Sequence, residues 1–361
     1  MRVLALNSSP RSSRHSKTEL MLTQLVGGMR NAGADVEVVA LRNKKIKDCR
    51  GCYTCWTKTP GRCVHKDDMT NELLPKLLQA DLVVHATPLY FHSMNGIMRR
   101  FVERTLPAIQ PFFEQTDCRT CHPLRHQLPK AVWLSVCGFP EESEFNMLSA
   151  LLHYLYDWEG RELVAEIYRP MAEFLVSRVA GDTAEDVFAA TRDAGYELIQ
   201  SGRIEQDTMD RIKQPIQDRS TMATVGNLAW NTCINEGVTM PQFQDRKMVA
   251  RPDSIETFML IMPYGLNRQA VENSRFLLQF HFSGEIKGSC YFTVTKDKVE
   301  ASIGTSTSPD LTIESPFEVW MDIMTEKAEG PQMFIEGKYR VDGDLALMMK
   351  LFEKENERTA A

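Results

Sequence analysis

Four cysteines within a span of 15 residues are the side chains best suited to chemistry. Cys49, Cys52, Cys55 and Cys63 follow the spacing C-x2-C-x2-C-x7-C, with a Pro-Gly turn before the last one. Steps of three residues followed by a turn can bring four thiolates into one small volume. Cuboidal iron–sulfur clusters are held by four thiolates and commonly use C-x2-C-x2-C runs, whereas zinc sites more often use two separated pairs. The spacing favours a [4Fe–4S] cluster over zinc, and a partly free set of buried thiols is the alternative.

A second cysteine pair is followed by histidine. Cys118, Cys121 and His122 form a C-x-x-C-H run, the attachment pattern of c-type haem. We reject haem because its attachment occurs outside the cytoplasm, and the sequence begins in an apolar strand rather than a signal peptide. A second metal site with His122 and His126 is one alternative, and an incidental pair is the favoured one. Cys137 has no evident base beside it, so we do not expect a nucleophile there.

A loop rich in hydroxyl and cationic side chains is the second candidate site. The apolar run 2–6 predicts a buried strand, and a helical pattern begins near Ser16. Free N–H groups and the positive end of the helix dipole make such a helix start suitable for a phosphate. A simple capped turn with solvated arginines is the alternative. The expected phosphate-binding residues are Ser9, Arg11, Ser16, Lys17 and Thr18.

Two further loops could hold a planar group. The loop 87–96 is stiffened by proline, and its aromatic side chains and backbone amides offer a flat surface to a ring; an aromatic contact with the core is the alternative. The loop 135–141 contains Gly138, which permits a close backbone approach. The expected contacts are Pro88, Leu89, Tyr90, Phe91, Ser93, Asn95, Gly96 and Gly138.

Alternating strands and helices position these loops. Alternation of this kind predicts a parallel sheet covered on both faces, and five strands fit the doubly wound, flavodoxin-like α/β order 2-1-3-4-5. Ligands in this fold lie at the carboxyl ends of the strands, where the loops after the first, third and fourth strands meet. We expect strands at 2–6, 36–40, 81–87, 131–136 and 162–168, with helices from 16 and at 70–79, 96–113, 143–158 and 184–200.

These loops resemble those of the flavodoxin-like NAD(P)H-dependent FMN reductase family. Ser8-Ser9-Pro10-Arg11 and Ser16-Lys17-Thr18 resemble its phosphate loop, with Ser8 in place of the usual glycine. Residues 88–104 resemble its flavin-loop signature, with Arg99 or Arg100 for lysine and Glu103 for aspartate. The resemblance implies an FMN whose phosphate lies at the first loop and whose isoalloxazine ring lies at the second, with NAD(P)H as electron donor.

The cysteine run has its own resemblance. It is similar to the compact motif of archaeal and bacterial iron–sulfur flavoproteins, which carry a [4Fe–4S] cluster beside FMN on this fold. Many flavin reductase relatives keep much of this cysteine pattern together with an Asp-Asp-Met run like Asp67-Asp68-Met69. The resemblance implies a one-electron relay to or from a ferredoxin-like carrier or a quinone.

The second half of the chain changes character. Residues 201–252 are polar and predict a connector with one or two helices, which could form a dimer or domain contact. Strands are expected at 276–282, 289–295, 298–303 and 311–313, and helices at 316–327 and 345–352, an α+β layout. The runs 280–284, 309–313 and 337–344 resemble the sterol carrier protein 2 (SCP2) domain, which implies an apolar tunnel for a lipid-like ligand. Methionines that merely fill a core are the alternative.

Composition sets the remaining expectations. A chain of 361 residues should form more than one domain, and we expect a flavodoxin-like domain at 1–202 containing the cysteine loop 49–63, a connector at 203–254 and an SCP2-like domain at 255–361. A net charge of −6 without a long basic run argues against nucleic-acid binding. No apolar stretch is long enough to span a bilayer. We expect a cytoplasmic homo-oligomer.

Two functions compete at this point. The first is an FMN-dependent oxidoreductase that exchanges electrons with NAD(P)H, a ferredoxin-like carrier or a quinone, and it requires no named catalytic side chain because the flavin carries the chemistry. The second is a binding protein for a hydrophobic ligand, in which the SCP2-like half binds and the flavodoxin-like half is a non-catalytic scaffold.

Overall fold

The computed structural model describes residues 1–12, 14–115, 120–157, 160–271 and 275–353. The chain divides into two compact units, Met1–Ile216 and Gln217–Ala361, and each is described here by itself. The three-part division expected from the sequence, with boundaries after residues 202 and 254, stays a prediction. Within the described residues, no helix combines the length and the apolar character needed to cross a membrane.

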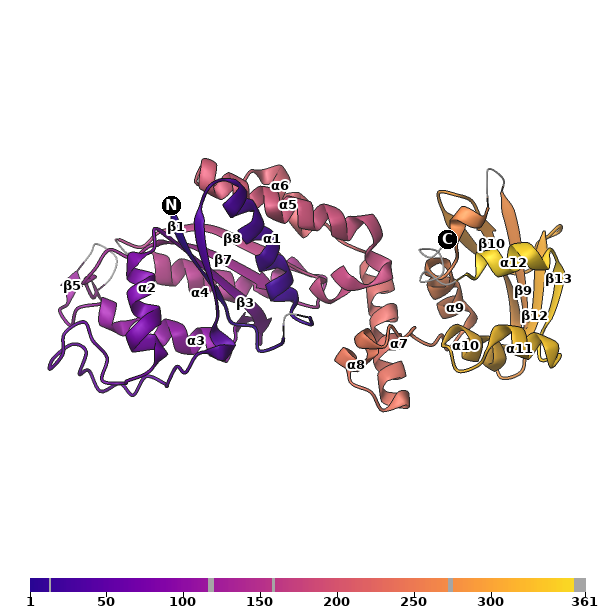
Figure 1. Cartoon of the computed structure of the whole chain (residues 1–361), viewed down its shortest axis with the longest axis horizontal. Helices are drawn as coiled ribbons and strands as arrows, with labels where there is room; N and C mark the ends of the chain where they lie inside the picture. The colour runs from indigo at the N-terminus through magenta and orange to yellow at the C-terminus, as the bar shows by residue number, and fades with distance from the viewer. Residues whose placement is uncertain (13, 116–119, 158–159, 272–274, 354–361) are drawn as a thin grey trace. The chain divides into compact units, whose positions relative to one another are not determined.

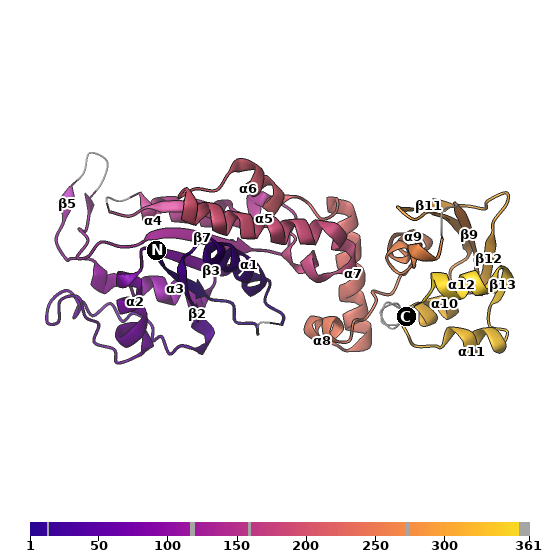
Figure 2. The same ribbon diagram turned by 45° about the horizontal axis from the view of Figure 1, so that its top comes forward.

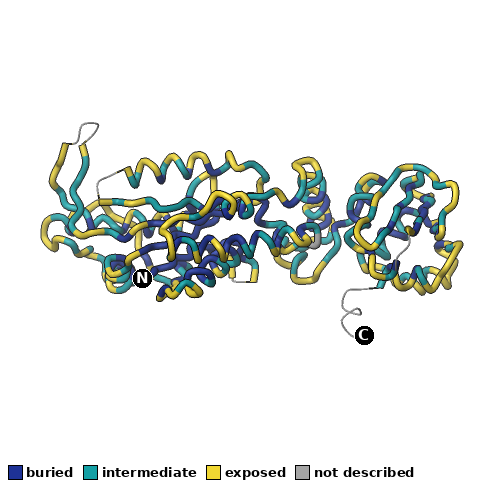
Figure 3. Tube along the Cα trace, turned by 90° about the horizontal axis from the view of Figure 1, so that it is seen from above, coloured by how far each residue is buried: buried dark blue, intermediate teal, exposed yellow. Residues whose placement is uncertain are grey.

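The first unit is built on five parallel strands in the order β2-β1-β3-β7-β8 (Figure 1). This confirms the doubly wound order expected from the sequence. The central strands are buried along most of their length, which explains their continuous apolar runs (Figure 3). The strands are β1 (Arg2–Asn7), β2 (Asp35–Ala40), β3 (Leu82–Tyr90), β7 (Lys130–Val136) and β8 (Leu163–Arg169), with β4 (Ser93–Met94) folded back antiparallel on β3.

Helices cover the sheet. The long helices α1 (Lys17–Asn31) and α5 (Gly181–Gln200) lie side by side (Figures 1 and 2). Their backbones touch at two glycines, because a Cβ added at Gly28 or Gly195 would lie 1.8 or 2.0 Å from a carbonyl oxygen of the other helix. The other helices are α2 (Leu74–Gln79), preceded by a π-helical turn at Met69–Leu73, α3 (Gly96–Glu103), α4 (Asn146–Tyr156) and α6 (Gln206–Lys213).

The helix expected at 96–113 is shorter than predicted. It ends at Glu103, a 3-10 turn follows at Leu106–Ala108, and Ile109 then pairs with Leu124 in an isolated bridge. Pro107 cannot donate a helical hydrogen bond and restricts the residue before it, which accounts for the early end. A small antiparallel pair, β5 (Glu114–Gln115) with β6 (Thr120–Cys121), lies beyond it, and Cys118 falls outside the described residues.

The second unit contains a five-stranded sheet in the order β11-β10-β9-β12-β13. Strands β9 and β12 are parallel and the other neighbours antiparallel, and the predicted hairpin of β10 with β11 is confirmed. The strand β13 was not predicted, because its four residues alternate weakly and include glycine. The strands are β9 (Phe276–Ser283), β10 (Gly288–Val294), β11 (Val299–Ile303), β12 (Leu311–Pro316) and β13 (Arg340–Gly343).

Aromatic rings fill the interior of this second unit. Phe258 contacts Phe280, Phe282 and Phe292 edge-on with ring centroids 5.0 to 5.7 Å apart, and Trp320 lies 5.2 Å from Phe280. The connector holds more helices than expected, and the helix predicted at 316–327 ends at Met324. The helices are α7 (Arg219–Glu236), α8 (Met240–Asp245), α9 (Ile255–Ile261), α10 (Phe317–Met324), α11 (Gly330–Ile335) and α12 (Leu345–Leu351).

Candidate functional site

The phosphate loop follows β1 at the carboxyl edge of the parallel sheet. Ser8 is fully buried, and its backbone N–H and its hydroxyl both donate to the carbonyl of Ala86 on the neighbouring strand, at 2.9 and 3.1 Å. The Asn7 side chain accepts from the Ser9 N–H at 2.9 Å. Ser8 therefore anchors the loop to β3. Because its hydroxyl already donates to Ala86, it is not free to donate to a phosphate.

Helix α1 begins directly after this loop. Ser16 is its N-cap, and its hydroxyl accepts from the Glu19 N–H at 3.0 Å. Ser9, Ser16 and Thr18 are each at least 98% buried, so their polar groups lie in a protected setting. The predicted residues thus lie around one helix N-terminus, where unpaired N–H groups and the dipole favour an anion.

Two cations and one carboxylate complete this corner. Arg11 Nη1 lies 2.5 Å from Glu173 Oε1, and Lys17 Nζ lies 3.6 Å from Glu173 Oε2. The Lys17 side chain is only 4% exposed, and burial lowers its pKa while Glu173 opposes that shift. Sequence reasoning missed Glu173, which lies on a 3-10 turn after β8 at Ala172–Val176. Its carboxylate occupies the neighbourhood in which a phosphate would meet the same two cations.

Asn95 holds the loop after β1 and the loop after β3 together. Its side chain donates to the Ser8 carbonyl at 2.7 Å and accepts from the Met98 N–H at 3.1 Å, where it caps helix α3. Its backbone N–H donates to the Thr87 hydroxyl at 3.1 Å. Asn95 is 3% exposed, and these hydrogen bonds fix the position of the loop; its expected contact with the flavin stays a prediction.

The aromatic loop forms a tight hairpin turn. Leu89 pairs with Met94 and Tyr90 with Ser93, and Phe91 and His92 make the turn with positive φ angles of 47° and 59°. Phe91 is fully exposed and Tyr90 is 43% exposed, so neither is the core contact that the alternative interpretation required. Pro88 lies on β3 opposite Val136 of β7, and Gly96 is the first residue of α3.

The loop after β7 also reaches the phosphate corner. A Cβ added at Gly138 would lie 3.6 Å from Glu173 Cγ, and the Cys137 N–H donates to the Arg169 carbonyl at 3.1 Å. Burial raises the pKa of Cys137 to about 11, which agrees with the expectation that it is no nucleophile. The three predicted loops therefore meet at one edge of the sheet.

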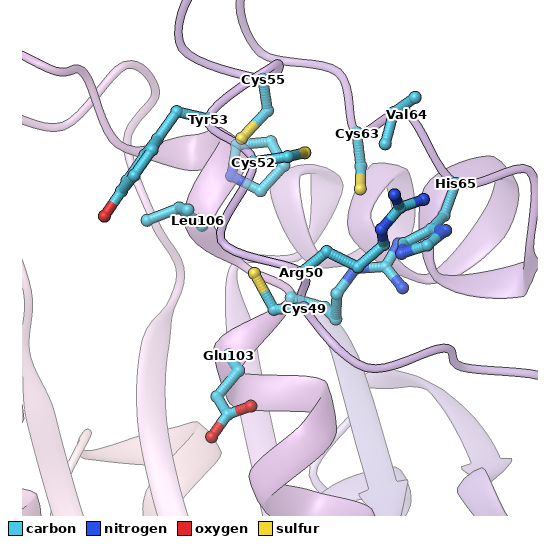
Figure 4. Close-up of a pocket in the computed structure, with 12 residues that line it drawn as sticks. Cys49, Arg50, Cys52, Tyr53, Cys55, Cys63, Val64, His65, Glu103 and Leu106 are labelled. Carbon is cyan, nitrogen blue, oxygen red and sulfur yellow. The ribbon is translucent and has the colours of Figure 1, made fainter.

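The four clustered cysteines line a second cavity, shown in Figure 4. Their sulfurs border it together with Arg50, Tyr53 and His65, and its volume is ≈ 20 Å³. Hydrogen bonds from Thr54 lower the pKa of Cys52, whereas burial raises the pKa of Cys55. The four thiols thus border one cavity. Over the described ranges, however, no set of three or more His, Cys, Asp or Glu side chains has the arrangement of a metal site.

A buried ion pair anchors the cysteine loop. Arg104 Nη1 and Nη2 donate to the two oxygens of Asp67 at 2.7 and 3.1 Å, and both side chains are 1% exposed. Arg104 also donates to the Lys47 carbonyl at 2.6 Å. Burial alone would raise the pKa of Asp67, but the hydrogen bonds from Arg104, Lys47 and Thr70 hold it well below its usual range.

The charged residues of helix α3 brace it. Arg99 pairs with Glu103 one turn later at 3.1 Å, and Arg100 pairs with Asp48 at 2.7 Å. Cys121 lies on β6, and the Nδ1–H of the next residue, His122, donates to the Phe112 carbonyl at 2.9 Å.

Comparisons with known proteins agree with the three sequence resemblances. Residues 1–115 match the NADPH-dependent FMN reductase family, and residues 265–353 match the SCP-2 sterol transfer family. An iron–sulfur flavoprotein of Archaeoglobus fulgidus is 36% identical over 107 residues, which are 30% of this chain and 46% of that protein. One of Methanocaldococcus jannaschii is 28% identical over 107 residues, 30% of this chain and 53% of that protein. The chain thus spans about half the length of the curated relatives it matches.

Solved structures with a low level of similarity to this chain include two reductases. An azoreductase of Bacillus anthracis is 14% identical with a TM-score of 0.42, and the match covers 55% of this chain and 98% of that one. An NAD(P)H:quinone oxidoreductase of Methanothermobacter marburgensis is 18% identical with a TM-score of 0.42, covering 55% and 96%.

Proposed function

We propose that this protein is an FMN-dependent oxidoreductase that takes electrons from NAD(P)H. The observation that carries the proposal is the convergence of a buried lysine, an arginine and a capped helix N-terminus beside an exposed aromatic turn, all at the carboxyl edge of a parallel sheet. The match of residues 1–115 to the FMN reductase family supports it.

The residues fit the phosphate end of FMN. A phosphate accepts hydrogen bonds, and the corner offers the Ser9 hydroxyl, the first N–H groups of α1, and the cations of Arg11 and Lys17. Among the described residues, the buried Lys17 Nζ has a carboxylate contact to Glu173 at 3.6 Å and a long hydrogen bond to the His15 carbonyl at 3.5 Å, so a dianion would stabilise its charge. Tyr90 and the backbone from Pro88 to Gly96 would then lie along the isoalloxazine ring. FMN would supply hydride and single-electron transfer when bound.

The four thiols support a [4Fe–4S] cluster as a second cofactor. They border a single cavity and supply the four sulfur ligands such a cluster needs. Because the present cavity is small, we expect the loop 49–63 to open when the cluster is incorporated. The Arg104–Asp67 pair would fix the base of this loop while its tip rearranges.

The test is a visible spectrum of the protein purified without oxygen, with iron and acid-labile sulfide measured on the same sample. We expect flavin absorbance, release of FMN on denaturation, and iron and sulfide that are lost in Cys52→Ala but kept in Cys233→Ala, a buried isolated cysteine. Colourless protein that does not associate with added FMN would refute the oxidoreductase. Yellow protein without iron would refute only the cluster.

The competing function is a carrier of a hydrophobic ligand. The match of residues 265–353 to the SCP-2 sterol transfer family supports binding of a hydrophobic ligand as a role of the second unit. The intact phosphate corner favours the oxidoreductase as the activity of the chain, because a scaffold would not need to bury Lys17 beside a helix N-terminus. A homo-oligomer remains our expectation for the assembly, and its mass in solution would decide it.

A further inference from the structure

A cavity in the core of the first unit belongs to neither candidate site. It has a volume of ≈ 60 Å³ and is lined mainly by residues of β3, β7 and the helices α2, α3 and α4. It shares no lining residue with the cavity bordered by the four cysteines, the thiol cavity. Val83 and His85 line it from the first half of β3, whereas the phosphate corner lies at the carboxyl edge of the sheet. We call it the His85 cavity, and most of its lining side chains are apolar or aromatic.

His85 brings an unsatisfied polar atom to this cavity. The residue is 5% exposed, and its Nδ1 has no hydrogen-bond partner among the residues that the structure describes. Its imidazole stacks on the indole of Trp133, with ring centroids 4.4 Å apart. A buried polar atom without a partner costs stability, and most such atoms in native proteins are satisfied by protein, water or a ligand. The cavity is therefore a place where a bound molecule can satisfy His85.

Tyr156 adds a second polar group to the lining. Its hydroxyl accepts from Trp133 Nε1 at 3.2 Å, so Tyr156 and His85 both contact the same indole. A phenolic hydroxyl donates as well as accepts, and an imidazole Nδ1 is a donor or an acceptor according to the tautomer. A hydroxyl group on a ligand can satisfy either tautomer, because it also donates one hydrogen bond and accepts another.

The setting of the cavity disfavours a charged ligand. Burial lowers the pKa of His85 to about 3, raises the pKa of Tyr156 and lowers the pKa of Arg161, so three lining groups are all shifted toward their neutral forms. A charged molecule would lose its hydration in the same setting. The rings of Phe101 and Trp133 among the lining residues favour a flat aromatic body, because aromatic rings pack well against one another.

We propose that the His85 cavity binds a small, uncharged phenol, whose hydroxyl bonds to His85 Nδ1 and the Tyr156 hydroxyl while its ring packs against Trp133. This site goes beyond the proposed function, since it requires neither FMN nor the thiol cavity. A volume of ≈ 60 Å³ exceeds the space that one water molecule needs, and an apolar cavity of about 150 Å³ holds benzene. We therefore expect the half-buried side chains of Val102 and Leu155 to move apart as the ring enters.

The experiment titrates the full chain, as purified, with para-fluorophenol and with fluorobenzene, and follows both by fluorine NMR. Fluorobenzene has the same ring without the hydroxyl. We expect saturable binding of para-fluorophenol with a dissociation constant of about 1 mM or lower, and binding of fluorobenzene that is about tenfold weaker. His85→Phe keeps a ring against Trp133 but removes Nδ1, so it should weaken para-fluorophenol about tenfold and leave fluorobenzene unchanged. The matched control is His126→Phe, at an exposed histidine of the same unit.

A second variant keeps the test valid if His85→Phe does not fold. Tyr156→Phe removes only the hydroxyl from a ring that lines the cavity, and it should weaken para-fluorophenol several-fold. Tyr196→Phe makes the same change at an exposed tyrosine of helix α5, and it should bind like the parent protein.

Three outcomes would overturn the proposal. The first is the absence of saturable binding to the parent protein at millimolar concentrations, which would leave water as the partner of His85. The second is equal affinity of the parent protein, His85→Phe and Tyr156→Phe for para-fluorophenol, which would place the ligand elsewhere, and a change in flavin absorbance on binding would identify the flavin site as that place. The third is tighter binding of benzoate than of phenol, because Arg161 would then recognise a charged ligand.

Discussion

Replacement of Glu173 by glutamine should strengthen the binding of FMN. Glu173 touches both cations of the phosphate corner, so a phosphate must compete with its carboxylate for Arg11 and Lys17. The Glu173 side chain is 39% exposed, which screens these pairs and places each at about 0.2–1 kcal/mol. Loss of two such contacts amounts to about 1 kcal/mol, which corresponds to a roughly fivefold lower dissociation constant. Glutamine preserves the length of the side chain and its packing against Gly138.

The assay titrates flavin-free protein with FMN and, in parallel, with riboflavin, following the quenching of flavin fluorescence. Riboflavin has the same ring but no phosphate, so its affinity should not change. Glu185→Gln is the matched control, because Glu185 is an exposed carboxylate on helix α5 of the same unit. The advantage of Glu173→Gln should shrink at high salt, since salt screens the exposed ion pairs.

Three results would contradict this reasoning. Equal affinities of parent and variant for FMN would mean that the phosphate does not use Arg11 and Lys17. Equal strengthening for FMN and riboflavin would mean that the substitution acts on the ring site or on the fold. Weaker binding of FMN would show that Glu173 helps to position the corner for the ligand.

Four further substitutions test the scaffold. Gly195→Ala should lower the free energy of unfolding by about 1–3 kcal/mol or more, since the added methyl group would meet the backbone of α1. Gly27→Ala should raise the free energy of unfolding by about 0.5–1 kcal/mol, because no atom lies within 4 Å of the added methyl group. Denaturant titration of both variants measures the difference. Asp67→Asn should cost about 3–5 kcal/mol in the same assay by leaving a buried guanidinium unpaired, and an unchanged midpoint would argue against the brace. Burial lowers the pKa of His85 to about 3, so its contribution to stability is complete above about pH 6.5 and falls by about 1.4 kcal/mol per pH unit below it; His85→Leu should lose that slope between pH 6.5 and 4.

The first unit could be predicted from sequence where local chemistry decides the structure. The apolar runs of the central strands and the start of α1 near Ser16 are properties of a few adjacent residues, and both appear where expected. Glu173 could not be found in this way. It meets Arg11 across 162 residues of sequence, and only the placement of β8 at the edge of the sheet brings its turn to the phosphate corner.

The length of helix α3 could not be predicted from its sequence pattern. Its amphipathic pattern continues to Phe113, but the chain leaves the helix after Glu103 because Pro107 interrupts the backbone and Arg104 is drawn toward Asp67. The sequence contained both Asp67 and Arg104 within family-like runs, yet their pairing depends on how the cysteine loop folds back on the helix. A pattern of apolar residues does not predict the long-range pairing of Arg104 with Asp67.

The two candidate sites are joined by this same short helix. Asn95 caps its N-terminus and holds the Ser8 carbonyl of the phosphate loop, while Arg104 at its C-terminus holds Asp67 and the Lys47 carbonyl of the cysteine loop. Eight helical residues span about 12 Å, and both ends are fixed by buried hydrogen bonds. Because a helix of this length bends little, the distance between the phosphate corner and the base of the thiol cavity is set by its length. The tip of the cysteine loop can therefore rearrange while the separation between its base and the phosphate corner stays constant.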